Sequence, residues 1–262
     1  MHMSRPKRNH TSIRYYLFKV KGWLSRKLPT RTWWRNQKMG DAELLALHLA
    51  RIHFKHPYAW LWWQLMRDMF EHLPSYTQAY TRLFKLLPVL QLLLMPQTRP
   101  RRYVIVDSQP IPACRWVRRQ RCKVVGAWEG YSQQGAFYGF SLHAFVSAKG
   151  EIFLYCIRSA NQHDYKVAQS LLEVAKVLGQ PIKLGDKAYL SDDFVTPPKK
   201  NSRSATGWKA PYSKIRKRVE TVFSQLVNAH IRLGQYQTKR ALEVRVALTI
   251  LAHNLKIWGI AD

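Results

Sequence analysis

Three carboxylates in the sequence stand beside apolar residues, where an ionised side chain is costly. Asp107 follows the run VIV, Asp186 follows the run IKLG, and Glu220 lies between valines of an apolar stripe. Most of the other acids among the 15 in the chain have ordinary positions at helix starts, on helix surfaces or in turns. Burying a carboxylate beside such runs is unfavourable unless a metal ion or a partner group satisfies it. These three side chains are therefore the first candidates for chemistry.

The elements predicted around the three acids can bring them together. A β-branched strand over 103–107 ends on Asp107, and a strand over 181–184 closes on Asp186. Glu220 belongs to a long helix that begins near Ser213 and would pack beside those strands. The acids are separated by 79 and 34 residues, so only the tertiary fold can gather them.

The other elements predicted after residue 98 complete a mixed sheet. Alternating apolar residues predict two strands joined by a turn at 148–150, and Asp164 or Asn161 is expected to cap the helix that follows. The expected strands cover 136–146, 152–157 and a final segment near 194–196. The order β-β-β-α-β-(β)-α indicates an α/β fold in which helices flank the sheet.

The chain divides by composition into three segments. Residues 1–37 are basic and aromatic, and we expect an arm that lies on DNA or on the next domain. Residues 38–97 show helical periodicity, with Ser75 as the N-cap of one helix; a helix-turn-helix and a plain helical bundle both fit this pattern. A connector rich in Pro and Arg then leads into the α/β domain at 98–262.

The net charge indicates a polyanionic partner. The chain has 43 Lys and Arg against 15 Asp and Glu, a formal charge of +28 that is spread along its whole length. Membrane-surface proteins usually concentrate their charge on one amphipathic helix, whereas a basic surface over successive folded regions suits a long polymer that releases counterions. Nucleic acid is the favoured partner.

No membrane or secretory feature is expected. The longest uncharged apolar run, 86–98, is too short for a membrane span and contains two prolines. The basic N-terminus lacks the apolar core of a signal peptide. Three cysteines without a CxxC pair make a disulfide framework or a structural zinc site improbable. We therefore expect a cytoplasmic protein with no membrane partner.

Five stretches together carry a resemblance to a known family. The chain resembles bacterial insertion-sequence transposases of the DDE class, and within them the insertion sequence 982 family, over about residues 38–260. The stretches are DSQPIPAC at 107–114, RWVRRQRCK at 115–123, YGFSLH at 138–143, LGDKAY at 184–189 and RVETVFSQL at 218–226. The resemblance implies a ribonuclease-H-like catalytic domain, preceded by a small all-helical DNA-binding domain.

The resemblance also implies a metal site and a reaction. Asp107, Asp186 and Glu220 would be the catalytic residues and would hold two Mg²⁺ ions, with Mn²⁺ as a substitute. Oxygen ligands suit Mg²⁺, and a two-metal clamp stabilises the attacking and leaving oxygens of an in-line displacement. The enzyme would cut DNA at the terminal inverted repeats of its element and join the 3′ ends to target DNA by hydrolysis and transesterification. It would act on double-stranded DNA as a homodimer in a synaptic complex, in association with the bacterial nucleoid.

Basic residues near the predicted site are candidates for DNA contact. The predicted DNA-binding residues are Arg118, Arg119, Arg121, Lys123, Lys187, Lys214, Arg216, Lys217 and Arg218. Contacts of this kind go mainly to phosphates and carry little sequence information. Lys187 is equally compatible with a surface lysine at a strand end, and Arg216 with a residue that orients Glu220. The resemblance places His143 near the site, where a core histidine would fit as well.

Other classes of protein explain less of the sequence. A catalytically silent nucleic-acid-binding protein derived from a transposase would explain the charge, but all three acids are present. A metal-dependent nuclease of unrelated fold would normally carry Glu-x-Lys after its Asp, whereas Asp186 runs directly into Lys187. A ribosomal-type RNA binder would leave the three acids without a role.

Overall fold

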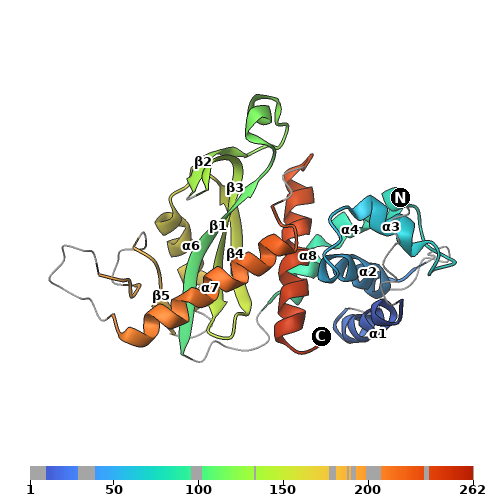
Figure 1. Ribbon diagram of the computed structural model, residues 1–262, viewed down its shortest axis with the longest axis horizontal. Helices are drawn as coiled ribbons and strands as arrows, with labels where there is room; N and C mark the ends of the chain where they lie inside the picture. The colour runs from blue at the N-terminus through green and yellow to red at the C-terminus, as the bar shows by residue number, and fades with distance from the viewer. Residues whose placement is uncertain are drawn as a thin grey trace, which may run out of the picture.

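The chain folds into a helical N-terminal region and a mixed sheet flanked by helices (Figure 1). The computed structural model describes residues 10–28, 39–95, 102–132, 134–176, 181–187, 189, 193–198, 208–232 and 236–261. Its elements are α1 (His10–Lys27), α2 (Asp41–His53), α3 (Ala59–Met66), α4 (Tyr76–Lys85), α5 (Leu87–Leu93), β1 (Tyr103–Pro112), the 3₁₀ helix η1 (Trp116–Arg121), β2 (Trp128–Ser132), β3 (Gly135–Ser147), β4 (Ile152–Ser159), α6 (Asp164–Lys176), β5 (Ile182–Leu184), α7 (Ala210–Asn228) and α8 (Lys239–Ile257).

The sheet is built on the long strand β3. β3 pairs antiparallel with β1, with β2 and with β4, and β1 pairs parallel with β5. The β1–β5 register sets Ile105 beside Leu184, so both strands run in the same direction at that point. The predicted mixed sheet is confirmed: β1, which carries Asp107, lies between β3 and β5, and Asp186 follows β5.

Each face of the sheet has its own apolar core. Along β1, Val104 and Val106 pack in one cluster with residues of α6, while Ile105 packs in another with residues of α7 and α8. Strand side chains alternate between faces, so this pattern assigns α6 to one face and α7 to the other. Figure 1 shows α7 crossing one face of the sheet.

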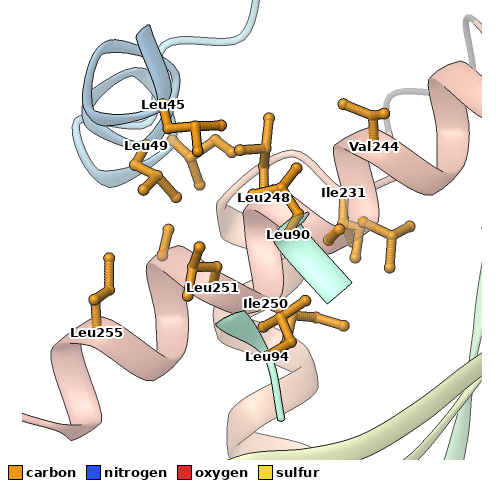
Figure 2. Close-up of a cluster of buried hydrophobic side chains, with 14 of the residues drawn as sticks. Leu45, Leu49, Leu90, Leu94, Ile231, Val244, Leu248, Ile250, Leu251 and Leu255 are labelled. Atoms are coloured by element: carbon orange, nitrogen blue, oxygen red, sulfur yellow. The ribbon is translucent and has the colours of Figure 1, made fainter. Parts of the chain in front are cut away.

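Helix α8 joins the two parts of the molecule. It is buried almost along its full length, and its leucines and isoleucines meet Leu45 and Leu49 of α2, Leu90 of α5 and Leu94 just after it (Figure 2). The same cluster continues through α7 onto the sheet. One apolar core therefore spans the N-terminal helices and one face of the sheet.

The N-terminal helices confirm one predicted start signal and are joined by an ion pair. Ser75 caps α4 in a capping box, in which its hydroxyl accepts from the Gln78 N–H and the Gln78 amide oxygen accepts from the Ser75 N–H. Arg82, also on α4, pairs with Asp41 at 2.5 Å and donates to the Met39 carbonyl. Arg82 is therefore committed to holding α4 against α2.

Several sequence predictions were wrong in detail. β1 does not end on Asp107 but continues to Pro112, because the ladder to β3 extends past two prolines. The polar stretch before β3 contains the short strand β2, and the final strand near 194–196 is reduced to one bridge between Val195 and Leu184. The N-terminal arm contains α1, whose apolar side packs in the core; residues 1–9 and 29–37 of that arm lie outside the described residues.

None of the helices in the described ranges is long and apolar enough to cross a membrane.

Candidate active site at the β1 and β5 carboxylates

Asp107 lies in the middle of β1 with a carboxylate that burial makes costly to ionise. Its pKa is raised to about 7, mainly by burial and also by the charges of Asp186 and Asp164, while the Ser108 N–H and Arg216 oppose the shift. Its Oδ1 accepts from the Ser108 backbone N–H at 2.8 Å. The positive charge of Arg216 places the side chain on the α7 face of the sheet.

Asp186 reaches the same place from the neighbouring strand. Ile105 and Leu184 are partners in the parallel β1–β5 pair, and each carboxylate comes two residues after its partner strand residue. Because the strands run in the same direction, the two acids meet at one level of the sheet. The charge of Asp186 raises the pKa of Asp107, which indicates that these two side chains lie close together.

Glu220 lies on α7, one turn after Arg216. Its side chain is 56% exposed and pairs with the Arg216 guanidinium at 3.4 Å. Arg216 also lowers the pKa of Asp107, so its positive charge acts on both the β1 carboxylate and Glu220. The apolar side of α7, with Val219 and Val222 in the core, fixes the helix on the sheet and leaves Glu220 at its edge.

The carboxylates supply the oxygen donors that a divalent cation prefers. The charge of Asp186 already raises the pKa of Asp107, and a cation between the two carboxylates would remove that repulsion. Within the described ranges, no three His, Cys, Asp or Glu side chains come together as a metal-holding group. The structure thus brings two of the three predicted ligands together and leaves Glu220 paired with Arg216.

A second polar cluster lies on the α6 face, directly behind Asp107. The Ser108 hydroxyl donates to Asp164 Oδ2 at 2.9 Å, and His143 Nδ1 lies 3.8 Å from Asp164 Oδ1. Ser108 and His143 are direct cross-strand partners of β1 and β3. Tyr189, also buried on this face, has its pKa raised by burial and by the charges of Asp164, Asp107 and Asp186.

Sequence reasoning missed the role of Asp164 in this cluster. It expected Asp164 or Asn161 as a helix cap, and α6 indeed begins at Asp164. The contact with Ser108 spans 56 residues, and no spacing signal in one sequence distinguishes such a residue from an ordinary cap. The fold alone reveals that this acid faces the sheet.

His143 is a neutral buried histidine. Its side chain is fully buried, and burial lowers its pKa to about 4, against the opposing charge of Asp164. Neither ring nitrogen has a hydrogen-bond partner. His143 therefore meets Asp164 as an uncharged ring.

The basic cluster at η1 lies beyond the far end of β1. Arg118, Arg121 and Lys123 are exposed. Arg119 stacks its guanidinium over Trp116 at 4.5 Å and pairs with Glu129 at 2.9 Å. In Figure 1 this segment projects from the β2–β3 end of the sheet. Three of its four predicted DNA contacts point to solvent.

A second set of basic residues follows α7 past the carboxylates. Lys214 and Lys217 are exposed, and Lys187 is exposed immediately after Asp186. Arg218 donates from Nη2 to the Lys149 carbonyl at 2.8 Å, which ties α7 to the β3–β4 turn. Positive charge therefore borders the carboxylate pair on two elements.

A cavity of about 260 Å³ lies farther along α7, where it meets α2 and α8. Lys55, Lys256, Gln225 and Asn228 are among its lining residues. Asn228 is eight residues beyond Glu220, about 12 Å along a helix. Asp107, Asp186 and Glu220 are not among its lining residues, so the cavity is separate from the carboxylates.

The fold and the site together define a class of protein. A mixed sheet flanked by helices, with paired carboxylates on adjacent parallel strands and an acid on the helix across them, is consistent with a ribonuclease-H-like DDE domain. Residues 97–232, just over half of the chain, match the family model of the transposase DDE domain. The protein belongs to this family. No curated protein matches the chain.

Proposed function

We propose that this protein is the transposase of an insertion sequence, which cuts DNA at the terminal inverted repeats of its element and joins the freed 3′ ends to target DNA. Membership of the DDE domain family supports transposase activity and DNA as the partner. The observation that carries the proposal at the level of residues is that Asp107 and Asp186 each follow the paired residues Ile105 and Leu184 by two positions, and that the charge of Asp186 acts on Asp107. The five motif stretches support a narrower assignment to the insertion sequence 982 family.

Asp107, Asp186 and Glu220 would hold two Mg²⁺ ions, or Mn²⁺ in their place. Bound there, the ions would activate the attacking oxygen and stabilise the leaving oxygen of an in-line displacement at phosphorus. In the protein without metal, the Arg216 guanidinium pairs with Glu220, and its positive charge also acts on Asp107. Binding of the cations therefore requires Arg216 to release Glu220, and the freed guanidinium is then placed to bind a DNA phosphate.

The exposed Lys and Arg side chains would bind the DNA. Lys187, Lys214 and Lys217 border the carboxylates, and Arg118, Arg121 and Lys123 extend the basic surface at η1. Contacts of these residues with phosphates would hold the duplex against the carboxylates by counterion release. We propose that the helices between residues 38 and 97 bind the element ends, and that two copies of the chain pair those ends in a synaptic complex.

The deciding experiment measures cleavage and strand transfer on a duplex that carries the ends of the element, with and without Mg²⁺. We expect Mg²⁺-dependent products from the wild type and a loss of at least about 1,000-fold in Asp107→Asn, Asp186→Asn and Glu220→Gln, because each removes a charged ligand of the reacting centre. Glu71→Gln is the matched control, since Glu71 is an exposed acid outside the segment that matches the family.

Two results would contradict the proposal. Activity that survives in all three acid variants would place the chemistry elsewhere. A wild type that binds the ends but cuts nothing in Mg²⁺ or Mn²⁺ would instead favour a silent nucleic-acid-binding protein.

A further inference from the structure

Asp164 makes contacts that a helix cap does not need. Asp164 stands at the first residue of α6, where a carboxylate is favourable beside the helix N-terminus. Its two oxygens, however, point to the sheet: Oδ2 accepts from Ser108 of β1, and Oδ1 lies 3.8 Å from His143 of β3. One side chain therefore ties α6 to the two central strands at the level of Asp107.

Ser108 connects this contact to the carboxylate pair. Its hydroxyl donates to Asp164 on the α6 face, while its backbone N–H donates to Asp107 Oδ1 at 2.8 Å. Holding the hydroxyl fixes the backbone of Ser108, and with it the direction of the N–H that orients the Asp107 carboxylate. Asp164 thus acts on Asp107 across the strand and without touching it.

His143 is an independent sign that the cluster is built for more than packing. Its ring is fully buried and both nitrogens lack a hydrogen-bond partner, with Nδ1 directed at Asp164. Buried polar groups without partners are uncommon in folded proteins because each costs about 1–3 kcal/mol. An apolar side chain would be more stable at this buried position. The histidine therefore indicates that the placement of Asp164 matters more here than the stability of the core.

We propose that Asp164 is a positioning residue of the active site, which orients Asp107 for metal binding through Ser108. The inference rests on the proposed function, since it assigns Asp107 to a metal site. Residues that orient metal-binding carboxylates typically change metal affinity about 10- to 100-fold when they are removed.

The test is calorimetric titration of Mn²⁺ into the full-length protein, for the wild type, Asp164→Asn, Ser108→Ala and the double variant. We expect each single variant to weaken Mn²⁺ binding about 10-fold or more. The double variant should lose little beyond the larger single effect, because both changes break the same link. Glu173→Gln is the matched control: it removes one charge from the exposed side of the same helix and should leave Mn²⁺ affinity unchanged.

Thermal unfolding of the same variants in EDTA separates positioning from a purely structural role. A cap of α6 would change the melting temperature and leave Mn²⁺ affinity at the level of the Glu173→Gln control, which would overturn the inference. Ser108→Ala keeps α6 intact and serves the same purpose if Asp164→Asn folds poorly. Weak binding in Asp164→Asn with normal binding in Ser108→Ala would also overturn it, because the charge would then act directly and not through Ser108.

The proposed function and this inference fail in different ways. If the wild type binds no Mn²⁺, or if Asp107→Asn binds it normally, the metal site itself is wrong and both proposals fall. If Asp107→Asn loses binding and Asp164→Asn does not, only the role of Asp164 is disproved.

Discussion

Two buried polar regions of this protein, one at α8 and one at the carboxylates, are satisfied to very different degrees. At the end of α8, the Asn254 side chain donates to the Ile152 carbonyl at 2.7 Å and accepts from the Ile152 N–H at 3.0 Å. Next to it, His253 Nε2 donates to the Gly150 carbonyl at 2.8 Å, and Trp258 donates to Glu151 at 2.9 Å. These bonds lock α8 onto the β3–β4 turn.

The carboxylate region shows the opposite balance. Asp107 is buried near two further acids, and its pKa rises to about 7 as a result. Behind it, the ring nitrogens of His143 and the hydroxyl of Tyr189 are buried without hydrogen-bond partners. The carboxylate region is therefore less stable than it would be with apolar or fully hydrogen-bonded side chains at these positions.

The difference separates structure from function within one fold. Complete pairing around Asn254 is what a junction needs if its only task is to hold a helix in place. Crowded acids and unpaired polar groups at β1 are unfavourable until a cation and a substrate arrive, which is the usual cost of a site prepared for charge. Stability measurements on the two regions should therefore move in opposite directions.

The largest change in stability is expected at the α8 junction. Asn254→Ala removes both partners of Ile152 and leaves a buried N–H and a buried carbonyl unpaired, so we expect the free energy of unfolding to fall by about 3 kcal/mol. Urea denaturation would measure this change. Asn228→Ala is the control, because Asn228 is an exposed asparagine at the end of α7 and its loss should cost little. Equal losses of unfolding free energy in Asn254→Ala and Asn228→Ala would show that the hydrogen bonds of Asn254 do not stabilise the junction.

A smaller change of opposite sign is expected at Asp107. In EDTA at pH 8, Asp107→Asn should raise the free energy of unfolding by about 1–3 kcal/mol, because it removes a buried negative charge close to Asp186 and Asp164. The same variant is expected to lose catalysis. A gain in stability with a loss of activity is the signature of a site that sacrifices stability for function.

The size of this effect depends on pH. The folded pKa of Asp107 is raised to about 7 from 3.8, so the wild type should lose stability as pH rises between those values. Unfolding in EDTA at pH 5 and pH 8 would show this slope in the wild type and a flatter slope in Asp107→Asn. A parallel slope in both proteins would remove Asp107 as its source.

Local sequence patterns predicted the elements better than their contacts. The apolar runs before Asp107 and Asp186 identified two strands, because β-branched alternation is a local signal. The parallel register that sets the two acids side by side depends on pairing between segments 79 residues apart, and no local pattern specifies it. The same limit explains why the sequence indicated only a helix cap at Asp164, whose partner Ser108 lies 56 residues away.

Glu220 shows a different limit. Its place on a helix beside the sheet follows from the periodicity of α7, whose valines face the core. Its direction does not, since Arg216 one turn earlier offers a competing ion pair at 3.4 Å. Glu220 can pair with Arg216 or bind a metal ion, and which of the two it does depends on whether a cation is present. The amino-acid sequence alone does not contain that information.

The smallest of the expected effects is an acid-dependent weakening of the α8 junction. Burial lowers the pKa of His253 below its usual 6.5, and Arg218 and Lys256 lower it further, while the bond to Gly150 opposes the shift. The ring is therefore neutral in the folded protein, and its contribution to stability is complete above pH 6.5 and is lost as pH falls toward the folded pKa. His253→Gln keeps an N–H donor for Gly150 but does not titrate, so the variant should lose less stability than the wild type between pH 7.5 and pH 5.5. Urea unfolding in EDTA at both pH values tests this, and a larger loss in the variant would mean that the junction tolerates a charged His253. Below pH 6.5 the two groups act with opposite sign, because protonation of Asp107 favours the folded protein and protonation of His253 disfavours it.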